Sequence, residues 1–182
     1  MDGEIYYPKS YDVIYRAGYI IGFAGIALFV YSYVFSYAQG FWAGMPVFYA
    51  GSLISSSFLL VWKKEIKIFI LSCVISGIIA GTAYVLFFKN AEVLIVSAGL
   101  VLAGLSGLYG KEAHCFHFAE GWILMWSFPV LVFANLLIYG SNLENGEAVH
   151  FIFSAVYIII TVLALSFLIK KLRQPLMQFC QN

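Results

Sequence analysis

The chain has 182 residues, of which 63% are hydrophobic and only 10% are charged, and its formal net charge is +1. This length corresponds to about one domain, and an apolar composition of this kind leaves no room for a sizeable soluble domain. The sequence shows no basic patch, which excludes a nucleic-acid partner. The expected partner is instead the lipid bilayer.

Uncharged runs long enough to cross a membrane follow one another along the chain. A helix rises about 1.5 Å per residue, so roughly 20 apolar residues cross a hydrocarbon core of about 30 Å. The run at 17–62 is long enough for two helices, and the cluster of Gln39, Gly40, Gly44 and Pro46 predicts a break within 37–46. Residues 1–182 are therefore predicted to form a single all-α domain, a polytopic six-helix transmembrane bundle. Its spans are expected at about 17–37, 42–62, 68–88, 93–110, 121–140 and 148–169.

The approach to the first span is acidic and rich in tyrosine. It lacks the basic region and the cleavage site of a signal peptide, so we expect the first span to remain as an anchor. Tyr7, Tyr11, Tyr15 and Tyr19 recur every four residues, which places them in one stripe on a helix. This pattern predicts an aromatic anchor at the membrane interface, and an aromatic binding face is the alternative interpretation.

The distribution of basic residues predicts the orientation. Six spans put the N-terminus, the second and fourth loops and the C-terminus on one side of the membrane. That side carries nine of the ten basic residues, and the other side carries only Lys89. Because basic residues are retained in the cytoplasm, both termini are expected to be cytoplasmic, in a multi-pass protein of the bacterial inner (plasma) membrane.

Small residues recur at helical spacing within three spans. Helices in a bilayer associate through close contacts between small residues, so spans 1, 3 and 4 are expected inside the bundle. Asn135 in span 5 should face a partner helix. The spans carry no acidic or basic residue near mid-membrane, which disfavours an ion-coupled transporter. The small residues concerned are Gly18, Gly22 and Gly25, Gly77 and Gly81, and Gly99, Ala103 and Gly107.

Polar residues of the kinds that bind metals or take part in catalysis cluster between spans 4 and 5. If this stretch is helical, His114, His117 and Glu120 are spaced i, i+3, i+6 on one side. Histidine and carboxylate are ordinary ligands of zinc and other divalent metals, so these three residues are the candidate metal ligands. Side chains of this kind are also simply soluble at a membrane interface, which is the alternative interpretation.

The same stretch carries a resemblance to a known family. The run Lys111-Glu112-Ala113-His114-Cys115-Phe116 follows a glycine-rich span in a chain of this size. It resembles a family of uncharacterised integral membrane proteins of bacteria and cyanobacteria, in which a Lys-Glu pair precedes Cys-Phe at the end of a small-residue helix. The resemblance implies a cofactor-binding or partner-binding role for Lys111, Glu112, Cys115 and Phe116, ahead of His114 and His117.

Three functional interpretations follow from these patterns. The first is a membrane protein of unknown biochemical activity whose cluster between spans 4 and 5, on the cytoplasmic side, binds a metal, a cofactor or a partner, including a second copy of the chain. The second is a small-molecule or lipid transporter. The third is a membrane-embedded enzyme acting at the cytoplasmic interface. The sequence contains no HExxH or GxSxG motif, which favours a non-enzymatic role.

Overall fold

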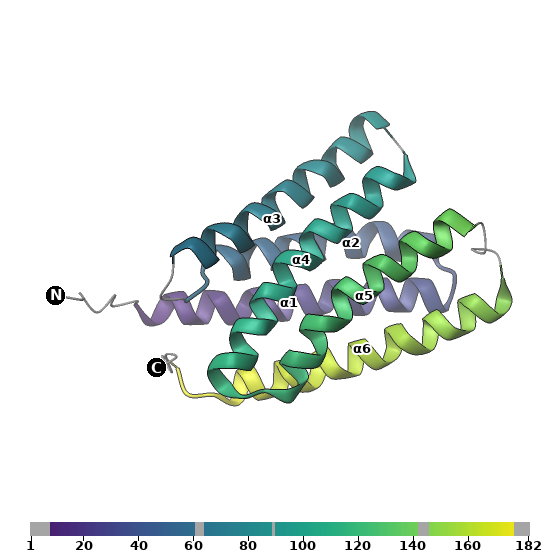
Figure 1. Cartoon of the computed structure of the whole chain (residues 1–182). Helices are drawn as coiled ribbons and strands as arrows, with labels where there is room; N and C mark the ends of the chain where they lie inside the picture. The colour runs from purple at the N-terminus through teal and green to yellow at the C-terminus, as the bar shows by residue number, and fades with distance from the viewer. Residues whose placement is uncertain (1–7, 61–63, 89, 142–145, 177–182) are drawn as a thin grey trace.

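The computed structural model describes residues 8–60, 64–88, 90–141 and 146–176, and within them every regular element is helical. Successive helices run antiparallel, so α1 begins and α6 ends at the same end of the bundle (Figure 1). The six helices are α1 (Lys9–Val34), α2 (Ala38–Ser57), α3 (Lys64–Ala83), α4 (Ala91–Phe116), α5 (Ala119–Ser141) and α6 (Glu147–Arg173), and α3 continues into a π-helical turn, η1 (Tyr84–Phe88). This confirms the prediction of an all-α bundle.

Five of the helices in the described part of the chain are long and apolar enough to cross a membrane, namely all except α2. α2 is rich in glycine and serine, which lowers its hydropathy although it lies where the second span is predicted. It packs along α1 in the most extensive helix contact of the bundle. The protein is thus a polytopic helical membrane protein.

The break between the first two helices lies earlier than the glycine and proline residues indicate. The chain turns at Phe35–Tyr37, where Ser36 has φ 52°, and Pro46 lies inside α2. A Cβ atom at Gly44 would lie 3.2 Å from the backbone oxygen of Gly25 in α1. The predicted break within 37–46 is therefore wrong in its position. At least Gly44 lies inside α2, where its small size allows close contact with α1 and does not mark a break.

The small-residue faces form the helix contacts that their spacing predicts. A Cβ atom at Gly18 would lie 2.6 Å from the backbone nitrogen of Ser55 in α2. A Cβ atom at Gly77 in α3 would lie 2.6 Å from the Val101 side chain in α4. α3 is nevertheless peripheral, because its opposite face is exposed, for example at Ile79. α4 packs on α2, α3 and α5, and α1, which packs on α2 and α6, is buried to the same extent. The prediction is therefore confirmed for spans 1 and 4.

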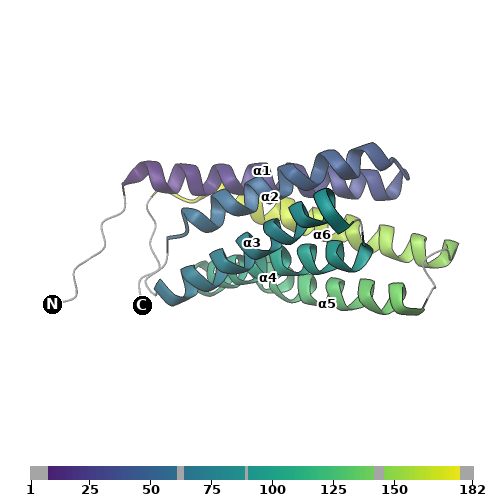
Figure 2. The same ribbon diagram turned by 90° about the horizontal axis from the view of Figure 1, so that it is seen from above.

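Polar side chains also join helices within the bundle. The Tyr49 hydroxyl lies 2.6 Å from Ser97 Oγ, and Ser97 donates its own proton to the backbone oxygen of Gly77 at 2.6 Å. This links α2, α4 and α3. Asn135 and Tyr157 exchange hydrogen bonds of 3.1 and 3.2 Å between α5 and α6, so the prediction for Asn135 is confirmed. Figure 2 shows α1 and α2 on one side of the bundle and α4 and α5 on the other.

Candidate functional site

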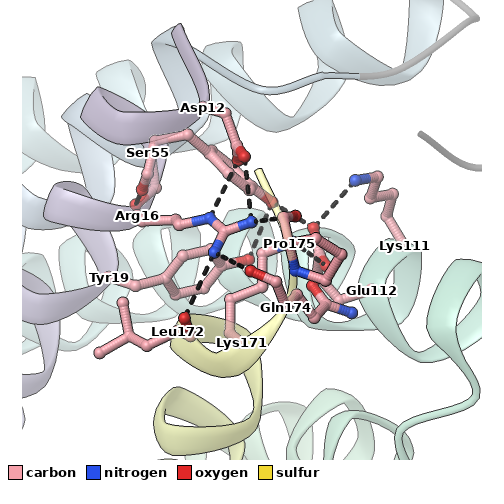
Figure 3. A network of polar contacts seen from close by, with 11 residues as sticks. Asp12, Arg16, Tyr19, Ser55, Lys111, Glu112, Lys171, Leu172, Gln174 and Pro175 are labelled. Atoms are coloured by element: carbon pink, nitrogen blue, oxygen red, sulfur yellow. Dashed lines mark hydrogen bonds and ion pairs between the residues drawn. The ribbon is translucent and has the colours of Figure 1, made fainter. Parts of the chain in front are cut away.

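A buried ionic cluster lies at the end of the bundle where α1 begins and where α4 and α6 end. Its centre is the Glu112 side chain, which is 0% exposed. Glu112 Oε1 accepts hydrogen bonds from Tyr15 at 2.7 Å and from Lys111 at 2.9 Å, and Oε2 accepts one from Lys171 at 2.6 Å. Together with Phe116, these residues are called the Glu112 cluster below. Figure 3 shows the two lysines reaching Glu112 from different helices.

Aromatic rings surround the charged groups of the cluster. The Lys171 ammonium lies 4.6 Å from the Phe116 ring centroid and 5.4 Å from that of Tyr15, and Lys111 lies 5.5 and 5.6 Å from the same rings. Such positions over aromatic faces favour cations. Because Tyr15 donates its single proton to Glu112, the hydroxyl bond of 3.0 Å between Tyr15 and Tyr19 must be donated by Tyr19.

A second ion pair lies beside the cluster and fastens α1 to the end of α6. Arg16 forms two hydrogen bonds with Asp12, of 3.2 and 3.0 Å, one helical turn away. It also donates to the backbone oxygens of Gln174 at 2.7 Å and Pro175 at 2.9 Å (Figure 3). A longer contact of 3.5 Å reaches the backbone oxygen of Leu172 in the last turn of α6. The last carbonyls of a helix lack partners within the helix and carry partial negative charge, which favours a guanidinium at this position.

The charges that the described part of the chain contributes to this site do not balance. The buried groups are the carboxylates of Asp12 and Glu112, the guanidinium of Arg16 and the ammonium of Lys171, and Lys111 adds an ammonium that is 10% exposed. Within the described residues, three cations and two anions leave one positive charge, since Lys111 and Lys171 share the single carboxylate of Glu112. Burying a charge without a counterion is costly, and the negative ends of α4 and α6 offset only part of that cost. The arrangement is therefore suited to attract an anion.

The structure brings together part of the predicted cofactor set. Lys111, Glu112 and Phe116 are in contact, and Cys115 lies half-buried in the same last turn of α4. The sequence interpretation missed Lys171 and Tyr15. The tyrosine stripe was predicted to anchor the chain at the membrane interface, but Tyr15 and Tyr19 are buried in the core, 0% and 5% exposed.

The interpretation of the stripe is therefore wrong for these two residues, while Tyr7 lies outside the described residues. The useful signal in the sequence was the continuation of the stripe into the first span. A buried tyrosine needs a partner for its hydroxyl, and Tyr15, just before the predicted first span, finds it in Glu112.

The predicted metal ligands do not converge. α4 ends at Phe116, and His117 adopts the left-handed conformation (φ 55°, ψ 36°) before α5 begins at Ala119. The helical alignment of His114, His117 and Glu120 is therefore wrong. Both histidines are exposed, while Glu120 Oε1 accepts from Ser166 and pairs with Lys170. Among the described residues, no three His, Cys, Asp or Glu side chains are placed to hold a metal ion, so the metal hypothesis gains no support.

Comparison with known proteins identifies one family. The model of a family described as uncharacterized integral membrane protein (DUF2301) matches residues 53–178, which is well over half of the chain. The match begins within α2 and includes Lys111, Glu112 and Lys171, whereas Tyr15 and Arg16 of α1 precede it. No curated protein and no solved structure matches the chain. The chain belongs to the DUF2301 family of uncharacterized integral membrane proteins.

Proposed function

We propose that this is a non-enzymatic protein of the bacterial inner membrane, with both termini in the cytoplasm, and that its cytoplasmic end binds an anion at the Glu112 cluster. The orientation rests on the nine-to-one division of basic residues. The antiparallel order of the helices places the start of α1 and the end of α6 on the same side, because Arg16 of α1 contacts the backbone just after α6. The Glu112 cluster then lies at the cytoplasmic end of the bundle.

The orientation predicts the result of reporter fusions. A fusion after Asn182, or after Lys64 at the start of α3, should place the reporter in the cytoplasm. A fusion after Tyr37 or Gly146 should place the reporter on the opposite side of the membrane. Paired alkaline phosphatase and green fluorescent protein fusions measure this directly, since one is active only outside the cytoplasm and the other only inside. A C-terminus outside the cytoplasm would contradict the proposed orientation.

The observation that carries the anion site is the sharing of one carboxylate by two ammonium groups. Lys171 is buried and donates to Glu112 Oε2, while Lys111 donates to Oε1 and is 10% exposed. A lysine ammonium has three donors, and each of these two gives one to Glu112. An anion approaching from the Lys111 side would meet the remaining donors and the surplus charge.

Phosphate-type groups are the anions that suit such a site. They are available at the cytoplasmic surface both as free anions and as phospholipid headgroups, and basic groups at that surface attract anionic lipids. The Phe116 ring, half-buried over both ammonium groups, limits the competing contact with water. The site therefore fits a phosphate group whose source the following experiment distinguishes.

Anion binding should raise the thermal unfolding midpoint of the detergent-purified protein, since a ligand that binds only the folded state stabilises it. We expect a larger rise with dioleoylphosphatidylglycerol than with the zwitterionic dioleoylphosphatidylcholine. Lys111→Gln should abolish the difference, while Lys64→Gln, which alters an exposed lysine at the same end, should preserve it. An equal rise with inorganic phosphate would identify the free anion as the source. Equal midpoints with both lipids and no rise with phosphate would contradict the site.

A further inference from the structure

A disulfide-bonded cysteine lies at the end of the bundle that carries the Glu112 cluster. The Cys115 sulfur, in the last turn of α4, takes part in a disulfide bond. Cys73 on α3 is a free thiol. The sequence contains three cysteines, so Cys180 is the remaining candidate within the chain. Cys180 itself lies outside the described residues.

Side chains join the end of α6 to the last turn of α4, where Cys115 lies. Lys171 of α6 donates to Glu112 of α4 at 2.6 Å. The same ammonium lies 4.6 Å from the centroid of the Phe116 ring, which directly follows Cys115 in the sequence. The chain therefore leaves α6 at the place where α4 ends.

The length of chain beyond α6 is sufficient to reach Cys115. Arg16 holds the backbone just past α6 by donating to the backbone oxygen of Pro175 at 2.9 Å (Figure 3). The described part of the chain ends at Leu176, and Cys180 follows four residues later. Four residues span up to about 14 Å. This is long enough to cross the gap between α6 and α4 that the Lys171 side chain already bridges.

Cys115 lies beside the exposed member of the Glu112 cluster. It follows Lys111 by four positions on α4, so the two side chains are neighbours on one face of the helix. Lys111 is 10% exposed and is the group from whose side an anion would enter. A segment bonded to Cys115 would lie next to this ammonium. Residues 177–182 contain no acidic side chain, so this C-terminal segment would cover the site without supplying a negative side chain.

We propose that Cys115 and Cys180 form a reversible disulfide that controls the access of anions to the Glu112 cluster. In the oxidised protein the C-terminal segment lies beside Lys111 and excludes the anion, and reduction releases the segment and opens the site. This inference rests on the proposed function, because the anion site and its cytoplasmic location both belong to that proposal. The cytoplasm keeps thiols reduced, so a disulfide there acts as a redox sensor and not as a permanent crosslink.

Exchange with a small disulfide, such as oxidised glutathione, supplies the chemistry. The thiolate of one cysteine attacks a glutathione sulfur, which forms a mixed disulfide and releases one glutathione thiolate. The thiolate of the other cysteine then attacks the protein sulfur of the mixed disulfide and releases the second glutathione. The two cysteines lose two electrons and two protons, and the glutathione disulfide gains both. Reduced glutathione reverses the two steps.

Peptide mapping tests the pairing of the cysteines. The purified protein is treated with oxidised glutathione, its free thiols are alkylated, and a tryptic digest is analysed by mass spectrometry without reduction. Trypsin separates Cys115 from Cys180 in the peptides 112–170 and 174–182. We expect these peptides joined in the monomer and separated after reduction, with Cys73 alkylated in both cases. Unjoined peptides, or a bond between two chains seen as a dimer on a non-reducing gel, would overturn the pairing.

Anion binding in the two redox states tests the control of access. The rise in the thermal unfolding midpoint is titrated with dioleoylphosphatidylglycerol and with inorganic phosphate, each state being compared with its own ligand-free midpoint, since a disulfide itself adds stability. A segment that leaves the site open for a tenth of the time lowers the apparent affinity about tenfold. We expect this loss on oxidation in the wild type and in Cys73→Ser, and no loss in Cys180→Ser.

The outcomes separate this inference from the proposed function. Equal binding by the oxidised and the reduced wild type would overturn the control of access, while the anion site would stand. A loss on oxidation that persists in Cys180→Ser would overturn the role of Cys180. If the reduced protein bound neither ligand, the proposed function would fail and the control of access with it, whereas the peptide map would still decide the pairing of Cys115 with Cys180.

Discussion

Replacing Glu112 by glutamine should destabilise the protein more than any other single change at a charged residue. The variant keeps the shape of the side chain but leaves Lys111 and Lys171 without their shared counterion. Removing one partner of a buried ion pair costs about 3–5 kcal/mol, because the remaining charge stays buried. The free energy of unfolding, measured by denaturant titration in mixed micelles, checks this.

The control for Glu112→Gln is Glu65→Gln at the same end of the bundle. Glu65 is exposed in the first turn of α3, so its replacement should change stability by no more than about 0.5 kcal/mol. The double variant Glu112→Leu with Lys171→Met should recover much of the loss, because it removes a carboxylate and an ammonium together. If Glu112→Gln were as mild as Glu65→Gln, the cluster would have no role in stability.

Gly51→Ala should be the most damaging small change in the apolar part of the bundle. A Cβ atom at Gly51 would lie 2.5 Å from Gly22 Cα and 2.8 Å from the backbone oxygen of Gly18. These are backbone atoms of α1, so the clash can be relieved only by moving one helix away from the other. Overpacking of this kind costs about 1–3 kcal/mol or more, and separating α1 from α2 would also loosen their whole contact.

Two other glycines provide graded controls for Gly51→Ala. A Cβ atom at Gly107 would meet the Ile70 side chain at 2.8 and 3.0 Å, and a side chain can rotate, so Gly107→Ala should cost less. Gly140 has nothing within 4 Å of the added atom, so Gly140→Ala should be neutral or stabilising by up to about 1 kcal/mol, the difference in helix propensity. Equal effects at all three positions would show that the α1–α2 contact is not close-packed.

The Glu112 cluster connects stability with the proposed function. Its parts come from α1, α4 and α6, so binding at the cluster would strengthen contacts among three helices. The surplus positive charge that favours an anion is itself costly to bury. An anion that binds there and relieves this cost should therefore stabilise the folded protein. The thermal unfolding midpoint measures this stabilisation.

The sequence predicted the helices well because the relevant signals are local. Uncharged runs of sufficient length predict the helices, and the structure has a helix at each of the six predicted places. Their ends were predicted less well, since α4 continues from the predicted end at 110 to Phe116 and α1 begins at Lys9. Charged residues end a hydrophobic run without ending a helix, because lysine and glutamate are good helix formers.

The chain by itself determined the fold class, the one-sided placement of basic residues and the glycine faces that pack, all of which depend on residue type and helical spacing. It also showed Lys111, Glu112 and Phe116 as a group, because they are close in the sequence. Only the tertiary structure decided what surrounds Glu112, since Tyr15 is 97 positions away and Lys171 is 59 positions away. Helical periodicity gives the face on which a side chain lies but not which distant helix packs against it. For that reason the partners of Glu112 became visible only when α1, α4 and α6 were brought together.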